Sequence, residues 1–312
     1  MSRKILRLGT RRSDLALWQA RHLREKLLTL YPQLEVALIK IDTRGDKVLN
    51  QPIPELGGKG LFTDEIDQQL RRGEIDLAVH SLKDLPVELP KGLALAAVCD
   101  RRWVHDVLIA PNNFTLATLP SGSRVGTCSL RRTAQVKAFR HDLEILPLRG
   151  NVPTRLRKLE NGDYDAIVLA EAGVRRLGFD ARISEVLSTE IMLPAPAQGA
   201  LGIAIRADDA ELQNTLARLN DEIAAAETAC ERSLLQALGA GCQVPVAALA
   251  RVHGRELRCE ALVASVDGEK IVRHVIAGST AEAVALGKKL AQLLWRDGAD
   301  KILAFAPAKE GS

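Results

Sequence analysis

Strand-like and helix-like segments alternate through the first two thirds of this 312-residue chain, and this alternation constrains the fold more than any other feature. The strand-like segments are short runs of Val, Ile, Leu and Ala, and the segments between them repeat apolar residues at helical spacing. Such alternation predicts parallel sheets covered by helices on both faces. The expected strands are 5–10, 35–42, 75–81, 123–129, 143–150 and 164–173, and the expected helices are 13–32, 61–74, 130–142 and 152–162.

The pattern changes from about residue 218. A helix-like segment is followed there by three strand-like segments, which are joined at His253-Gly254 and at Asp267-Gly268. Short glycine-containing connections of this kind favour hairpin turns. A last helix is expected to end at Gly298. The sequence therefore predicts a separate small α+β domain with a three-stranded antiparallel sheet.

The net charge of +4 is modest but unevenly distributed. Residues 121–182 hold ten arginines and two lysines against seven acidic residues, an excess of five positive charges, so the rest of the chain is close to neutral. A basic segment of this kind predicts an anionic partner. Aromatic residues make up only 3% of the chain, too few for extensive base stacking, so we expect no nucleic-acid partner.

Nothing in the sequence indicates a membrane or secretory segment. No apolar run approaches the length of a membrane span, and the basic N-terminus lacks the apolar stretch of a signal peptide. The cysteines are odd in number and form no CxxC pair, which argues against disulfides and a metal site. We therefore expect a cytoplasmic protein without a metal. Three cysteines lie in apolar contexts and are predicted to fill the core: Cys99, Cys230 and Cys259.

Arginine and hydroxyl side chains recur where a predicted strand ends and a helix begins. In open α/β sheets these ends face the ligand crevice, helix N-termini attract anions, and arginine pairs with carboxylates. Any one of these arginines could be an ordinary solvated helix residue, but four such junctions together predict a cleft that binds a polyanion. The junctions carry Arg11 and Ser13; Thr127, Ser129, Arg131 and Arg132; Arg149 and Arg155; and Arg175 and Arg176.

Lys83 and Asp84 follow the predicted strand 75–81. A carboxylate at that edge can transfer a proton or stabilise a cation, although aspartate is also common in turns. His80, taken alone, is more typical of a core residue or of one that supports a site.

Cys242 lies in the glycine-rich segment GAGCQVP at residues 239–245. It is either an incidental thiol or a nucleophile whose thiolate is stabilised by nearby arginines. Residues 44–60 are rich in glycine, proline and charge, and they predict a mobile loop over a site.

Eight motifs occur in order along the chain: GTRRSDLALWQA, GGKGLF, AVHSLKDLP, GTCSLRR, LRGNVPTRLRKL, YDAIVLA, PAPAQGALGI and GAGCQVP. Together they resemble the porphobilinogen deaminase family over essentially the whole length. The resemblance implies two α/β domains of the kind found in type II periplasmic binding proteins, and a small α+β C-terminal domain that carries the cysteine loop. It places domain 1 at 1–99 and 200–217, domain 2 at 100–199, and domain 3 at 218–312.

The same resemblance implies a transferase of tetrapyrrole and heme biosynthesis. Members of the family join four porphobilinogen molecules head to tail, release four molecules of ammonia and form hydroxymethylbilane. The resemblance also implies a dipyrromethane cofactor bound through a thioether to Cys242. It further implies a monomer whose partner is the small-molecule substrate, with no membrane or nucleic-acid partner.

The resemblance assigns roles residue by residue. Asp84, with Lys83 beside it, is implied to be the main catalytic group. The implied cofactor-binding residues are Lys83, Asp84, Thr127, Ser129, Arg131, Arg132, Arg149 and Cys242. The implied substrate-binding residues are Arg11, Ser13, Arg149, Arg155 and Arg176. These residue types suit the chemistry, because each pyrrole unit carries an acetate and a propionate, and loss of ammonia leaves a cation that a carboxylate can stabilise.

The chain departs from the family pattern at three places. Cys128 stands where serine is expected, Ala197 stands where glycine is common, and residues 101–106 read RRWVHD in place of a more usual REDPRD. On the residues alone, two other functions stay open: a non-catalytic anion-binding protein of the periplasmic type and, third, a basic nucleic-acid binder.

Overall fold

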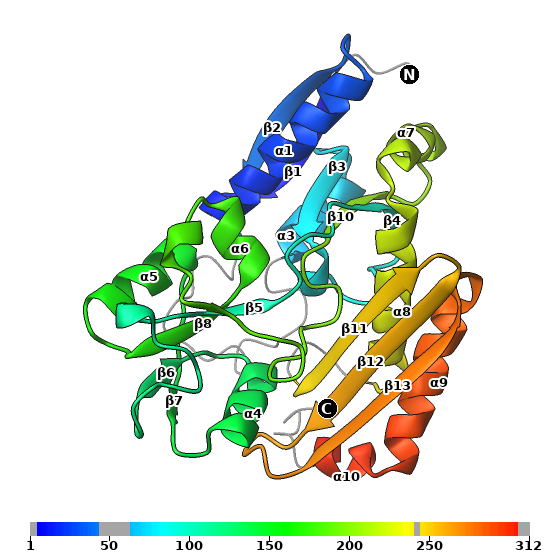
Figure 1. Cartoon of the computed structure of the whole chain (residues 1–312). Coiled ribbons are helices and arrows are strands. Elements are labelled where there is room, and N and C mark those ends of the chain that lie inside the picture. Colours follow the sequence, from blue (N-terminus) through cyan, green and yellow to red (C-terminus); the bar gives the residue numbers. More distant parts are fainter. Residues whose placement is uncertain (1–4, 44–62, 240–243, 305–312) are drawn as a thin grey trace. The chain divides into compact units, whose positions relative to one another are not determined.

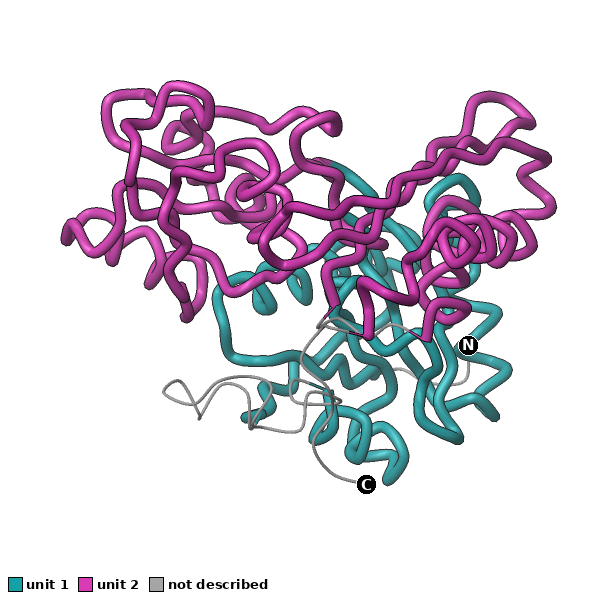
Figure 2. Tube along the Cα trace, turned by 90° about the horizontal axis from the view of Figure 1, so that it is seen from below, with its two compact units in different colours: residues 1–102, 199–225 teal, residues 103–198, 226–312 magenta. Residues whose placement is uncertain are grey.

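The computed structural model describes residues 5–43, 63–239 and 244–304. The chain divides into two compact units, which Figure 2 distinguishes by colour. Unit 1 comprises residues 1–102 and 199–225, and unit 2 comprises residues 103–198 and 226–312. Unit 2 thus combines most of the predicted second and third domains, and the division into three domains stays a prediction.

Unit 1 is built on a five-stranded sheet with the strand order β2-β1-β3-β10-β4 (Figure 1). Its strands are β1 (Ile5–Arg11), β2 (Glu35–Ile41), β3 (Leu77–Ser81), β4 (Leu93–Cys99) and β10 (Leu201–Arg206). Its helices include α1 (Asp14–Leu30), α3 (Asp64–Arg71) and α7 (Ala210–Leu216). β1 pairs in parallel with β2 and β3, whereas β10 runs antiparallel to β3 and β4. The sheet is therefore mixed, and the prediction of a purely parallel sheet is wrong. The antiparallel strand is β10, which comes from a segment that follows the residues of the second sheet.

Helices cover both faces of this sheet. Successive residues of a strand point to opposite faces, and β3 shows the consequence. Leu77 and Val79 belong to the core cluster that contains α1 and α7 residues, whereas Ala78 packs with Ile66 and Leu70 of α3. The strand ends that carry predicted site residues are thus fixed from both sides.

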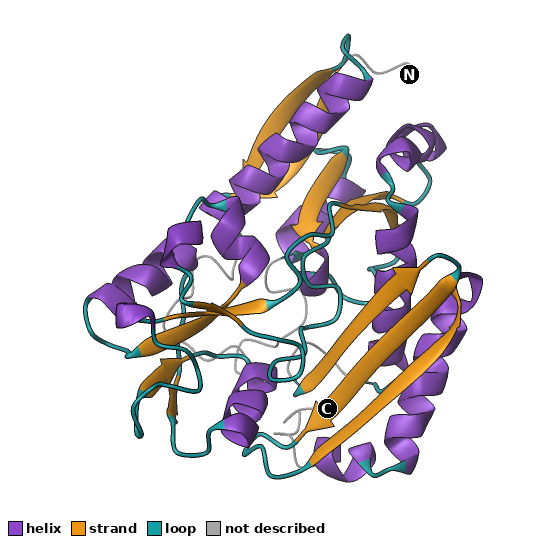
Figure 3. Cartoon of the chain, viewed as in Figure 1, coloured by secondary structure: helices purple, strands orange, loops and turns teal. Residues whose placement is uncertain are grey.

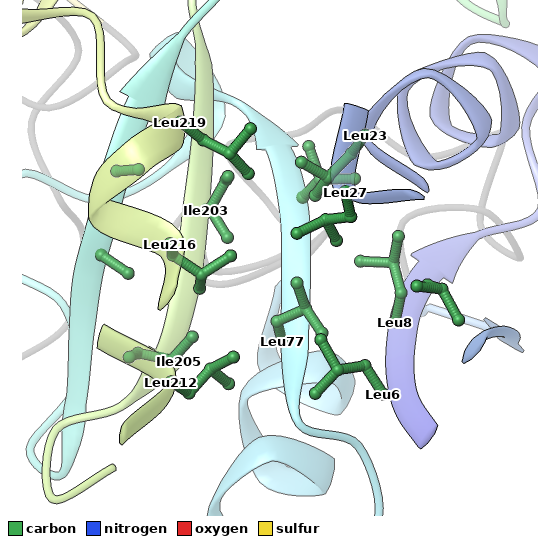
Figure 4. Packing of buried hydrophobic residues seen from close by; sticks show 14 of the residues in the cluster. Leu6, Leu8, Leu23, Leu27, Leu77, Ile203, Ile205, Leu212, Leu216 and Leu219 are labelled. Atoms are coloured by element: carbon green, nitrogen blue, oxygen red, sulfur yellow. The ribbon is translucent and has the colours of Figure 1, made fainter. Parts of the chain in front are cut away.

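The cluster on the α1 side spans segments far apart in the sequence. Figure 4 shows Leu23 and Leu27 on one side of the strand that carries Leu77, and Ile203 and Leu216 on the other. Burial of each such side chain contributes about 1.5–3 kcal/mol. The N-terminal strand and helix are therefore held in place by residues beyond position 200.

Unit 2 contains a second five-stranded sheet, with the strand order β7-β6-β8-β5-β9. Its strands are β5 (Asp106–Ile109), β6 (Arg124–Gly126), β7 (Glu144–Leu146), β8 (Ala166–Ala170) and β9 (Glu185–Val186). Its helices are α4 (Leu130–Phe139), α5 (Val152–Glu160) and α6 (Glu171–Arg176). β6 is parallel to β7 and β8, and β5 is antiparallel to β8 and β9. This sheet is also mixed, and it repeats the strand arrangement of the first.

The C-terminal part of unit 2 is a three-stranded antiparallel sheet with helices packed on one face (Figure 3). Its strands are β11 (Val246–His253), β12 (Glu256–Ala264) and β13 (Ile271–Ser279). Its helices are α9 (Ala283–Arg296), α10 (Ala299–Ala304) and α8 (Glu222–Ala237), which begins in unit 1 and continues into unit 2 at residue 226. The two turns contain Gly254 and Gly268, both at positive φ, as the sequence predicts. Cys99, Cys230 and Cys259 are buried, also as predicted. The predicted α/β class with a small C-terminal antiparallel sheet is confirmed.

Glu231 and Gly268 both lie where the C-terminal part of unit 2 contacts its α/β part. Glu231 of α8 is fully buried, and its carboxylate accepts hydrogen bonds from the backbone N–H groups of Ala197 and Ala250, both at 2.6 Å. Gly268 lies against α4 so closely that a Cβ there would meet the backbone nitrogen of Ala138 at 2.4 Å.

Within the described ranges, no helix has the length and apolar character needed to cross a membrane.

Candidate active site

Three predicted site residues meet at one small cavity in unit 1. Arg11 is the last residue of β1, Ser13 directly precedes α1, and Asp84 ends a short 3₁₀ turn that follows β3. All three line a cavity of about 60 Å³. They meet because β1 and β3 are parallel neighbours, so that their carboxyl ends lie at the same sheet edge. Lys83 belongs to the same 3₁₀ turn but is not among the described residues that line the cavity.

The cavity also has lining residues that sequence reasoning did not assign to the site. Gln19 of α1 is buried, and its Nε2 donates a hydrogen bond to Ser81 Oγ at 2.7 Å. Thr63, which precedes α3, also lines the cavity. Gln19 could have been found from its spacing, since it lies on the buried stripe of α1 at helical intervals from Ala16 and Leu23.

His80 is the most unusual residue of this cavity. Its side chain is 6% exposed, and its Nε2 is buried without a hydrogen-bond partner among the described residues. Burial, with a smaller contribution from the positive charge of Arg11, lowers the pKa of His80 to about 4. The imidazole is therefore neutral at physiological pH, with one donor and one acceptor nitrogen.

Three further junctions lie at one edge of the second sheet. β7, β6 and β8 are parallel neighbours, so the residues after them share that edge. After β6, the backbone N–H of Thr127 donates to Leu146 O at 2.9 Å, and the Thr127 hydroxyl accepts from the N–H of Ser129 at 3.2 Å. Ser129 directly precedes α4 and makes no side-chain cap to this helix. The edge therefore presents hydroxyl groups at a helix N-terminus, a suitable place for an anion.

Arg131 and Arg132 are not solvated helix residues but are buried around one carboxylate. Arg131 Nη1 donates to Asp106 Oδ2 at 2.7 Å, and Arg132 Nη2 donates to Asp106 Oδ1 at 2.7 Å. Gln198 Nε2 adds a third donor to Asp106 Oδ1 at 3.2 Å. Two guanidinium groups against one carboxylate leave one positive charge in excess, which a ligand carboxylate could balance. Asp106 is a supporting residue that sequence reasoning missed.

The arginines after β7 and β8 differ in how their side chains are used. Arg155 Nε donates to Gly150 O at 2.7 Å and so holds the turn that follows Arg149. Arg175 donates to Glu171 at 2.7 Å and to Asp180 at 2.8 Å. Arg176, in contrast, is buried at the end of α6. The two adjacent arginines therefore differ in their environment, because the guanidinium of Arg175 is already bound by two carboxylates.

Two expectations fall on residues that the structure does not describe. Cys242 lies within residues 240–243, and the predicted loop at 44–60 lies within residues 44–62. Both therefore stay predictions. Cys128, at the position where serine was expected, is described and is exposed.

The backbone geometry at Ala197 shows why glycine is common at this position of the family pattern. Its φ is +62°, in the left-handed region that glycine adopts most easily. The buried Glu231 carboxylate accepts from its N–H and helps to hold that conformation. Glycine is thus favoured at this position by backbone geometry, and alanine occupies it under strain.

Comparison with known proteins extends these observations. Residues 6–214 match the family model described as "Porphobilinogen deaminase, dipyromethane cofactor binding domain", and residues 225–296 match "Porphobilinogen deaminase, C-terminal domain". The porphobilinogen deaminase of Syntrophotalea carbinolica is 48% identical over 304 residues, covering 97% of this chain and 96% of that protein. The porphobilinogen deaminase of Geotalea daltonii is 46% identical over 312 residues, covering 100% of this chain and 98% of that protein.

Similar solved structures are more distant. The periplasmic aliphatic sulphonate binding protein SsuA from Escherichia coli shares 13% identity with a TM-score of 0.42, covering 99% of this chain and 90% of that chain. The periplasmic VFT2 domain of BvgS from Bordetella pertussis shares 16% identity with a TM-score of 0.43, covering 69% and 86%. Similarity at this level carries no argument about the present chain. The two family models and the relatives at 46–48% identity, in contrast, cover almost all of it, and this chain belongs to the porphobilinogen deaminase family.

Proposed function

We propose that this chain joins four porphobilinogen molecules head to tail to form hydroxymethylbilane, with release of ammonia. The observation that carries the proposal is the meeting of Arg11, Ser13 and Asp84 at one cavity of unit 1. A carboxylate beside an arginine suits a reaction in which a substrate that bears carboxylates forms a cation. In such a site the arginine holds the substrate and Asp84 stabilises the positive charge.

Asp84 has two tasks in this proposal. The side chain is exposed at the cavity, where a pyrrole N–H can reach it. Its carboxylate stabilises the cation left when ammonia departs, and it then assists proton removal after the new carbon–carbon bond has formed. Lys83, in the same 3₁₀ turn, is proposed to hold a ligand carboxylate near Asp84.

The basic edges hold the carboxylates of a growing chain. We assign Arg11, Ser13, Arg149, Arg155 and Arg176 to the substrate, because each lies on one of the parallel strands β1, β7 and β8 or on the loop or helix that follows it. Arginine pairs with carboxylates through two parallel hydrogen bonds, which fixes the orientation of each acetate and propionate. A series of such sites retains a flexible polyanion through successive additions.

The residues after β6 fit a dipyrromethane group. Thr127 and Ser129 offer hydroxyl donors, and Arg131 with Arg132 carries one positive charge in excess over Asp106, which suits the carboxylates of two pyrrole units. Lys83, Asp84 and Arg149 are proposed to complete this set, with Cys242 as the point of attachment. When bound, the group supplies a covalently held primer that is extended without release of intermediates. We further propose that the protein acts as a monomer in the cytoplasm, without a nucleic-acid or membrane partner.

Mass spectrometry and an ammonia assay test the proposal together. The intact holoenzyme should exceed its sequence mass by one dipyrromethane, and Cys242→Ser should remove that excess. Asp84→Asn should keep the excess mass and lose about 10²- to 10⁴-fold in ammonia release, the range for a proton-transfer group. Asp208→Asn, at an exposed aspartate of the same unit, should match the wild type. An unmodified wild type that is fully active would contradict the cofactor assignment, and an active Asp84→Asn would contradict the catalytic one.

A further inference from the structure

The glutamine of the PAPAQGALGI motif contacts the residue that organises the two buried arginines. Gln198 and Asp106 are both fully buried in unit 2. The Nε2 of Gln198 donates to Val104 O at 2.8 Å, to His105 O at 3.1 Å and to Asp106 Oδ1 at 3.2 Å. The amide therefore holds the two carbonyl groups directly before Asp106 as well as the Asp106 carboxylate itself.

These contacts bear on how Asp106 divides its oxygens between the arginines. A guanidinium and a carboxylate often form two parallel hydrogen bonds, one to each oxygen. Here both donors of Arg132 use Oδ1, and Oδ2 is left for Arg131 at 2.7 Å. Gln198 adds a donor on the Oδ1 side and fixes the backbone from which the carboxylate projects. Without this amide, Asp106 could rotate into a parallel pair with Arg132, and Arg131 would lose its charged partner.

The neutrality of the amide matters as much as its shape. Arg131, Arg132 and Asp106 carry two positive charges and one negative charge, and the remaining positive charge is the one proposed to meet a ligand carboxylate. A carboxylate in place of the amide would cancel that charge within the protein, and a lysine or arginine would double it. Glutamine donates hydrogen bonds at this position and adds no charge.

We infer that Gln198 is a positioning residue for the proposed dipyrromethane site. It holds Asp106 in the orientation that gives each arginine its own carboxylate oxygen, and it leaves one positive charge for the ligand. The inference rests on the proposed function and adds a residue that acts through Asp106.

Two substitutions separate the charge of this side chain from its shape. Gln198→Met keeps a similar length without a donor, whereas Gln198→Glu keeps the shape and becomes charged when it ionises. Three oxygens face the position of Nε2 in a buried site, so the pKa of a glutamate there is raised. This variant should resemble the wild type at low pH and cancel the excess positive charge at high pH. The ring of His105, the other titratable neighbour, lies 3.5 Å from Glu171 and is common to all variants.

Attachment of dipyrromethane to the full-length chain is the readout. Both variants should be isolated with a fraction of unloaded chains that the wild type lacks. These chains are incubated with porphobilinogen at about pH 6 and about pH 8.5, and intact mass follows the gain of one dipyrromethane. In Gln198→Glu this gain should be about tenfold or more faster at pH 6, the size expected for one hydrogen bond to a charged group. Ionisation of the Cys242 thiol acts in the opposite direction, because it favours attachment at high pH.

Gln198→Met supplies the baseline, because it has no group that titrates at this position. Its attachment should be slow at both pH values and should not improve at pH 6. If Gln198→Met does not fold, the comparison of the two pH values in Gln198→Glu decides.

Gln135→Glu is the matched control. Gln135 is also buried in unit 2, and its Nε2 donates to the carbonyl groups of Arg131 and Leu193. This variant should have a lower thermal midpoint but should be isolated loaded, like the wild type. The same pH response in Gln135→Glu would assign the effect to any buried glutamate and overturn the inference.

Two further results would overturn it. One is a Gln198→Met chain that is isolated fully loaded, and the other is a Gln198→Glu chain that gains dipyrromethane at equal rates at both pH values. A wild type isolated without the excess mass contradicts the proposed function itself.

Discussion

Arg132 donates two hydrogen bonds to the same carboxylate oxygen of Asp106, from Nε at 3.0 Å and from Nη2 at 2.7 Å. Arg131 donates to the other oxygen at 2.7 Å, and all three side chains are buried. This arrangement fixes the planes of both guanidinium groups before any ligand arrives. It therefore organises the proposed cofactor site through a residue that need not touch the cofactor.

Asp106→Asn should disrupt this site strongly. The change leaves two buried guanidinium groups without their counter-charge, and breaking a buried ion pair costs about 3–5 kcal/mol. We expect a lower thermal midpoint and a smaller fraction of holoenzyme by intact mass. Asp142→Asn is a matched control, because Asp142 pairs with Arg140 at 2.7 Å in the same unit but is partly exposed. Equal melting of Asp106→Asn and the control would contradict the assignment.

Arg175 and Arg176 should behave differently although they are adjacent. Arg176→Ala should weaken porphobilinogen binding by about 10-fold or more, since a hydrogen bond from a charged group contributes about 1.5–3 kcal/mol. Arg175→Ala should leave the Michaelis constant within about threefold, because its guanidinium is already bound to Glu171 and Asp180. Steady-state kinetics of the two purified variants checks this prediction. A larger effect on the Michaelis constant from Arg175→Ala would reverse the two roles.

Ala197→Gly should stabilise the protein. A non-glycine residue in the left-handed region costs about 1–2 kcal/mol, and Ala197 has a φ of +62°. Part of this gain is offset by the greater freedom of glycine in the unfolded chain, so the net gain should be about 1 kcal/mol or less. Ala195→Gly is the control, because Ala195 is outside the positive-φ residues of the described chain and should gain nothing. Denaturant unfolding of both variants measures the difference.

Asp67→Asn should stabilise the protein only above its titration range. Burial raises the pKa of Asp67 to about 6, although Thr63 and Arg71 act in the opposite direction. A carboxyl whose folded pKa is above its unfolded value does not lower the free energy of unfolding while it is protonated in both states. The loss of unfolding free energy grows between about pH 4 and pH 6 and is complete above pH 6, where it reaches up to about 3 kcal/mol.

Thermal midpoints at pH 4.5 and pH 8 check this dependence. The gain from Asp67→Asn should be small at pH 4.5 and larger at pH 8. Asp64→Asn, at an exposed position in the first turn of the same helix, should show no such growth with pH. A gain for Asp67→Asn that is the same at both pH values would mean that its charge is not what costs stability.

The sequence predicted the places of Arg11, Ser13 and Asp84 well, for a local reason. Each follows a recognisable strand, and parallel neighbouring strands bring their carboxyl ends together. The turns at Gly254 and Gly268 were predictable for a similar reason, because a short glycine-containing connection between two strands identifies a hairpin.

Features that depend on contacts between residues far apart in the sequence could not be predicted from local patterns. The partner of Arg131 lies 25 residues earlier, and the pair forms only because β5 joins the sheet beside β8. The antiparallel direction of β10 also depends on where the chain returns, which no local pattern encodes. The unpartnered Nε2 of His80 is a property of the folded core, since a histidine within a strand gives no sign of whether its nitrogens find partners.

The position of β10 has a consequence for biosynthesis. The second α/β sheet is complete once β9 ends at residue 186, but the first sheet lacks a central strand until residue 206 has been made. Domains usually fold in the order of their translation. Here, however, the N-terminal sheet can be completed only after all strands of the second sheet have left the ribosome. During that interval β3 and β4 both lack their shared neighbour, so a nascent chain stalled before residue 201 should expose unpaired strand edges to chaperones.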